Sequence, residues 1–117
     1  MSGPYCPVNK VHLKTSVRVH EILFNKYHPK IHISKNGTIQ SFIPYKKHTN
    51  IRNKHIETWE DIHGITETIL SDVDKCVKEN PECYIALVGL KNDTAMYLNT
   101  IYTPEEALYP IQLSDVY

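Results

Sequence analysis

Several side chains of this sequence could carry out acid–base chemistry, and all seven histidines lie within its first 63 residues. Cleavage of a phosphodiester without a metal needs two imidazoles, or one imidazole with Tyr and Lys, around a single phosphate. The stretch VHLKTSVRVH (residues 11–20) alternates apolar and polar residues and would place His12 and His20 on one side of a strand. His32 on a neighbouring strand would complete the cluster. The alternative function predicted here is therefore a metal-independent phosphodiesterase or ribonuclease that uses His12, His20 and His32.

Other catalytic classes have less support in the sequence. His55-Ile56-Glu57 and Pro81-Glu82-Cys83 resemble parts of the zinc-deaminase signature, but Cys83 has no second cysteine three residues away. A site with one histidine and two cysteines therefore cannot be built. The sequence has no G-x-S-x-G motif and only four glycines. We expect neither a metal ion nor another cofactor.

The basic residues of the amino-terminal half suggest a binding surface. Lys and Arg neutralise phosphates, so a common surface would favour nucleic acid or an acidic protein partner. The predicted surface consists of Lys14, Arg18, Lys30, Lys35, Lys46, Lys47, Arg52 and Lys54. The isoelectric point near 7 and the scarcity of aromatic residues beside these positions argue against a typical RNA-binding sheet.

The zero net charge hides an asymmetry between the two halves. Residues 1–58 carry ten basic and two acidic residues, whereas residues 59–117 carry three basic and eleven acidic residues. Halves of opposite charge can attract each other within one fold or across a twofold dimer, and we expect a homodimer. The acidic helix face that would meet the basic half of a second copy comprises Glu60, Asp61, Glu67, Asp72, Asp74 and Glu79. The late tyrosines fit either such an interface or core and rim packing: Tyr97, Tyr102, Tyr109 and Tyr117.

The length of 117 residues predicts a single domain, residues 1–117. Within it, Gly3, Pro4 and Pro7 predict an irregular arm at 1–9, and Pro104 and Pro110 predict an irregular tail at 103–117. Residues 46–57 are polar and basic and lack a usable periodicity, so they predict a loop. The longest apolar run, YIALVGL, is far shorter than the about 20 residues of a transmembrane helix, so we expect no membrane association. With three cysteines and no apolar leader, we expect an intracellular protein, cytoplasmic or nuclear.

Periodicity predicts the elements that would position these residues. We expect a strand over 11–20, with a helix starting at Thr15 or Ser16 as the alternative, and a hairpin around a type I′ turn at Asn36-Gly37. A capping sequence at Thr58 and apolar spacings of three and four predict a long helix that ends at Asn80-Pro81. The continuous apolar run 83–90 predicts a buried strand that turns at KND and returns over 94–102.

The predicted fold class is therefore α+β. A single mixed or antiparallel sheet of about five strands would pack on one long helix, as in ferredoxin-like or profilin-like two-layer sandwiches. On this basis we expect a small binding or regulatory module that engages a protein or nucleic acid through its basic, histidine-rich amino-terminal half.

Overall fold

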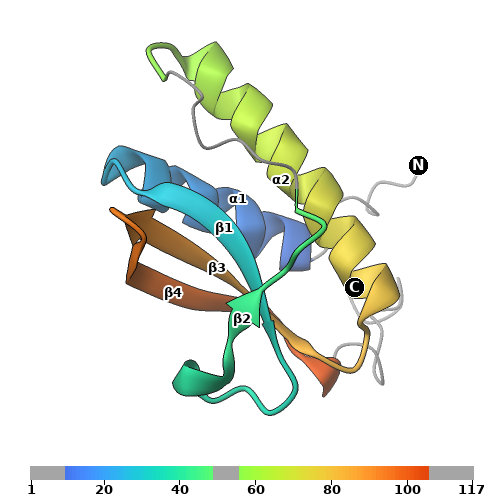
Figure 1. Ribbon diagram of the computed structural model, residues 1–117. Coiled ribbons are helices and arrows are strands. Elements are labelled where there is room, and N and C mark those ends of the chain that lie inside the picture. Colours follow the sequence, from blue (N-terminus) through green and yellow to red (C-terminus); the bar gives the residue numbers. More distant parts are fainter. Residues whose placement is uncertain (1–9, 49–55, 106–117) are drawn as a thin grey trace, which may run out of the picture.

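The computed structural model describes residues 10–48 and 56–105 (Figure 1). Their elements are α1 (Lys10–Phe24), β1 (His28–Ser34), η1 (Ile39–Ser41), β2 (Ile43–Pro44), α2 (Trp59–Glu79), β3 (Tyr84–Lys91) and β4 (Thr94–Tyr102). The strands form one antiparallel sheet in the order β2-β1-β3-β4, and α1 packs beside α2. The α+β class is confirmed, with four strands and two helices in place of about five strands and one helix. The likeness to ferredoxin or profilin sandwiches stays a prediction.

The core lies between one face of the sheet and the two helices (Figure 1). Ile31 of β1 is paired with Leu87 of β3, and Ile33 with Ile85, so these residues share one face. The fully buried Val19, Ile22, Ile69 and Val73 of the helices pack in the same cluster. Side chains at the alternate positions of β1, including Lys30 and His32, therefore lie on the opposite face of the sheet.

The long helix α2 lies where the sequence predicts it. Thr58 and Asp61 form a reciprocal capping box: the Thr58 hydroxyl accepts a hydrogen bond from the Asp61 amide, and the Asp61 carboxylate accepts one from the Thr58 amide. Ile62, Ile65 and Ile69 then recur on the buried side. The helix ends before Asn80, whose amide donates to the Cys76 carbonyl.

The prediction of a strand over 11–20 is wrong, because these residues lie in helix α1. A helix turns about 100° per residue, so positions two apart lie on nearly opposite sides. The alternating apolar residues therefore form two sets on opposite sides of the helix, and within each set the residues are four positions apart. Val11, Thr15 and Val19 face the core, whereas Leu13 and Val17 point outward.

The predicted type I′ turn at Asn36-Gly37 is also wrong, although β1 and β2 do pair. A type I′ turn needs positive φ at both central residues, and only Gly37 has it, at 79°. The Ser34 hydroxyl accepts hydrogen bonds from the amides of Asn36 and Gly37 instead. The chain then passes through η1 before it reaches the two-residue strand β2.

The strands predicted at 83–90 and 94–102 are confirmed as the hairpin of β3 and β4. Asn92 and Asp93 have φ of 52° and 64°, and these two positive values make the tight turn.

The predicted arm 1–9, most of the tail 103–117 and the centre of the 46–57 loop lie outside the described residues. Neither helix within 10–48 and 56–105 is long and apolar enough to cross a membrane.

Candidate functional site

The three histidines of the phosphodiesterase hypothesis have different surroundings. On α1, His12 Nε2 lies 2.6 Å from Asp74 Oδ1 of α2, and the ring of His20 lies 6.4 Å from that of Phe24. His32 is in β1 on the sheet face that points away from the helices, and burial lowers its pKa. The fold therefore does not gather these imidazoles around a common point, and nothing in it adds to the enzyme hypothesis.

A fourth histidine forms a contact with a buried carboxylate. His48 Nδ1 lies 2.9 Å from Asp72 Oδ2, and the two side chains are only 4% and 2% exposed. Burial lowers the pKa of His48 despite the opposing effect of the carboxylate. This contact ties the segment after β2 to the middle of α2, and it removes Asp72 from the predicted acidic face. The sequence contains a signal for it, because Asp72 lies on the apolar stripe between Ile69 and Cys76.

The cysteines within the described residues are not set up as nucleophiles. Cys76 and Cys83 are buried, and desolvation raises the pKa of the Cys76 thiol to about 12. No group of three His, Cys, Asp or Glu side chains in 10–48 and 56–105 is arranged to hold a metal ion.

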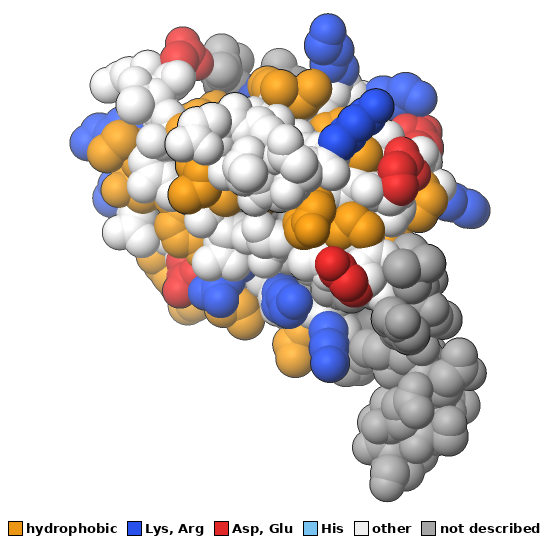
Figure 2. Space-filling model, turned by 90° about the horizontal axis from the view of Figure 1, so that it is seen from below, with side chains coloured by type: hydrophobic (Ala, Val, Ile, Leu, Met, Phe, Trp, Pro, Cys, Tyr) orange, Lys and Arg blue, Asp and Glu red, His pale blue; other side chains and the backbone are white. Residues whose placement is uncertain are grey.

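The predicted basic residues are spread over several elements. Arg18 of α1 donates to Glu21, whose other contact is the Tyr97 hydroxyl of β4. Lys30 lies on the opposite side of the sheet from α1, and Lys47 pairs with Glu79 at 3.3 Å. Of the other predicted members, Lys14 is on α1, Lys35 follows β1, Lys46 follows β2, and Arg52 and Lys54 lie outside the described residues. Figure 2 shows the cations of one face dispersed among hydrophobic and acidic side chains.

A row of exposed apolar side chains lies on the outside of α1. Leu13, Val17 and Phe24 are 61%, 47% and 61% exposed, and their spacings of four and seven place them along one side of the helix. Trp59 at the start of α2 is 70% exposed, and its ring meets that of Phe24 edge-on at 5.8 Å. We call these four residues the α1 outer face. A soluble domain seldom leaves several large apolar side chains together on its surface without a use for them.

The polar surroundings of the α1 outer face are basic at its amino-terminal end. Lys10, Lys14 and Arg18 line a shallow hollow of about 310 Å³ together with Leu13 and Val17. The one acidic residue of α1, Glu21, accepts hydrogen bonds from Arg18 and Tyr97, and these contacts lower its pKa. The stems of the basic side chains thus extend an apolar surface that carries positive charge along its border.

No known protein family matches the chain, and no curated protein is significantly similar to it.

The tyrosines predicted near an interface have different surroundings. Tyr102 is buried and its hydroxyl donates to the Pro81 carbonyl, and the Tyr97 hydroxyl donates to Glu21. Tyr109 and Tyr117 lie outside the described residues.

Proposed function

We propose that this protein is a binding module whose partner is another protein, and that the partner docks on the α1 outer face. The observation that carries this proposal is the pair of apolar series on α1. Thr15, Val19 and Ile22 satisfy the packing of the helix against its own fold, and among residues 10–48 and 56–105 nothing buries Leu13 or Val17.

The proposed partner segment is an amphipathic helix with acidic residues beside its apolar stripe. An apolar stripe of three turns is the surface that a helix from a partner would cover. Lys10 and Lys14 at its border favour carboxylates on that partner. The exposed acids of α2 do not supply this combination in a second copy, because no large apolar side chain between Glu60 and Asp74 is exposed.

A protein partner fits this surface better than a nucleic acid. Phosphate binding needs cations that converge, whereas Lys14 and Lys30 lie on opposite sides of the sheet and Arg18 and Lys47 are held by Glu21 and Glu79. The predicted nucleic-acid surface and the predicted homodimer remain predictions, and the experiment below separates both from the proposal.

The test measures binding of synthetic amphipathic peptides to the full chain. One peptide has leucines on one face and glutamates at their flanks, and the other has lysines in place of the glutamates. We expect the acidic peptide to bind more tightly. The double variant Leu13→Gln, Val17→Gln should weaken it roughly 30-fold, because each lost apolar contact contributes about 1 kcal/mol. The control Lys75→Gln, at an exposed position of α2, should bind like the wild type.

Three results would overturn the proposal. The first is equal affinity of both peptides with no effect of the double variant. The second is a wild-type dimer in sedimentation that the double variant converts to monomer, which would assign the face to a second copy. The third is salt-sensitive binding of short RNA with no binding of either peptide.

A further inference from the structure

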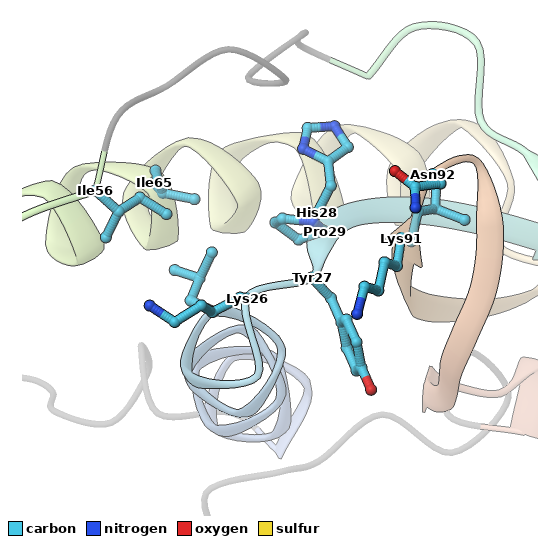
Figure 3. A pocket seen from close by; sticks show the side chains of 10 residues that line it. Lys26, Tyr27, His28, Pro29, Ile56, Ile65, Lys91 and Asn92 are labelled. Carbon is cyan, nitrogen blue, oxygen red and sulfur yellow. The ribbon is translucent and has the colours of Figure 1, made fainter.

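A second candidate site lies at one end of the fold, separate from the hollow beside Leu13 and Val17. The turn between α1 and β1, the turn between β3 and β4, and the first turns of α2 surround a cavity of about 530 Å³ (Figure 3). This volume is within the range of pockets that hold small organic molecules, about 300 to 1,000 Å³.

The floor of the cavity is apolar. Leu23 and Ile65 are buried side chains of the two helices, and Pro29 is buried at the start of β1. Leu90 of β3 and Ile56 before α2 add to the lining. A ligand that fills this space would therefore gain from an apolar body.

The charged groups at the cavity are both cations. Lys26 belongs to the turn after α1, and Lys91 belongs to the end of β3; Figure 3 shows the Lys26 side chain directed away from Lys91, whose side chain runs toward Tyr27. Neither ammonium group makes an ion pair with a described residue. The lining contains no Asp or Glu, and its other polar side chains, from Tyr27, His28 and Asn92, can donate hydrogen bonds. The electrostatic preference of the site is therefore for an anion.

Backbone geometry fixes Lys26 at this place. The Tyr27 amide donates to the Ile22 carbonyl and the Lys26 amide donates to the Leu23 carbonyl, which is the Schellman pattern of a helix end. Lys26 occupies the position of this motif that usually holds glycine, and its φ is 63°. A lysine in this conformation costs about 1 kcal/mol relative to glycine. The fold thus holds a cation at the cavity where the backbone alone favours a residue without a side chain.

Gly89 shapes the wall beside Lys91. A Cβ at Gly89 would lie 3.1 Å from Cβ and Cδ2 of Tyr27 and 3.2 Å from Cβ of Tyr97. The absence of a side chain at Gly89 therefore lets Tyr27 lie close over the sheet. The position of Tyr27, and with it that of the neighbouring Lys26 and His28, depends on this glycine.

We propose that this cavity binds a small organic anion that combines an apolar body with one carboxylate or phosphate group. The apolar body lies on Leu23, Ile65 and Leu90. The anionic group lies at the rim of the cavity, where Lys26 and Lys91 supply the positive charge and Asn92 can donate a further hydrogen bond.

The test is calorimetric titration of the full chain with four probes: octanoate, octyl phosphate, 1-octanol and inorganic phosphate. The proposal expects at least one of the two amphipathic anions to bind at least tenfold more tightly than both octanol and inorganic phosphate. The comparison of octanoate with octyl phosphate identifies the head group. Tight binding of octanol would show an apolar cavity without selection for charge, and binding of inorganic phosphate alone would show a surface cation site; either result overturns the proposal.

Matched variants locate the site. Lys26→Gln and Lys91→Gln should each lower the affinity for the preferred anion by about tenfold, because each removes a charge-assisted hydrogen bond. Lys91→Arg should retain binding, and Lys75→Gln on α2 should leave it unchanged. Gly89→Ala changes the shape of the cavity but no charge, and it should lower the affinity for the anion because the added methyl group displaces Tyr27. Unchanged affinity in both glutamine variants, with their thermal unfolding equal to that of the wild type, would overturn the assignment.

Discussion

The two helices of this protein cover the same sheet but present different surfaces to solvent. On α2 the large apolar side chains are buried or half-buried, except for Trp59 in its first turn, and its exposed positions are mostly charged or polar. On α1 a buried apolar side is matched by an exposed one. The packing of the described residues therefore accounts for most apolar residues of α2, but on α1 it leaves Leu13, Val17 and Phe24 exposed. This difference is the basis of the proposal that a partner docks on the outer side of α1.

The largest expected effect separates the two sides of α1. Ile22→Ala should lower the free energy of unfolding by about 4 kcal/mol, because Ile22 is fully buried and its truncation leaves a cavity. Leu13→Ala removes a similar side chain from the exposed side and should change stability by less than about 0.5 kcal/mol. Urea denaturation of both variants measures this comparison. Similar losses for the two variants would mean that the outer side also packs within the fold.

The next effect concerns the buried polar contact on α2. Asp72→Ala should destabilise the fold by about 2 kcal/mol, because it leaves the 4% exposed His48 imidazole without its hydrogen-bond partner. Asp72→Asn, which keeps a hydrogen-bonding group of the same size, should lose less. Glu67→Ala, which removes an exposed carboxylate of the same helix, is the control. If Asp72→Ala and Glu67→Ala have equal unfolding midpoints, the buried contact does not stabilise α2.

A smaller effect is expected at the start of α2. Thr58→Ala removes the hydroxyl that accepts from the Asp61 amide and should lower stability by about 1 kcal/mol. Thr58→Ser retains the hydroxyl and should recover most of this loss in thermal unfolding. A serine variant as unstable as the alanine variant would show that the capping hydrogen bond is not responsible.

The pH dependence follows from the histidines. Burial lowers the pKa of His48 and His32, so the unfolded chain binds protons more readily than the folded chain. Their contribution to stability is therefore fully present above the unfolded pKa of about 6.5 and is lost as the pH falls through the lower folded pKa. We expect the Tm to fall between pH 7.5 and 5.5, a range in which Glu21 and Glu79, whose pKa values are lowered, stay charged.

The variant His48→Gln checks the origin of this dependence. Relative to the wild type, its Tm should fall less between pH 7.5 and 5.5, whatever its absolute stability. A Tm that is flat in the wild type, or that falls equally in the variant, would contradict the assignment to His48.

The same contrast between the helices explains what the sequence could predict. In α2 the apolar residues form one stripe, so their spacing identifies the helix and its buried side. In α1 two apolar series lie on opposite sides of the helix, and together they imitate the alternation of a strand. The propensities of ten residues could not distinguish a helix from a strand here. The distinction depends on tertiary packing, which buries Thr15 and Val19 in the core and leaves Leu13 and Val17 exposed.

The candidate sites show a similar limit. The basic, histidine-rich half of the sequence does contain α1, but its charges diverge onto different faces once the chain folds. The cavity lined by Lys26 and Lys91 could not be predicted from the sequence, because these residues are 65 positions apart and come to line one cavity only through the pairing of β1 with β3. Likewise, the contact of Phe24 with Trp59 depends on how α1 packs on α2.

The most direct test of the central claim is an NMR titration of the full chain with the acidic amphipathic peptide. If the α1 outer face is the docking surface, amide shifts should concentrate in residues 10–24 and at Trp59, and residues 63–78 of α2 should change little. A titration in which the shifts concentrate at residues 30–35 and 46–48, or along the exposed side of α2, would contradict it.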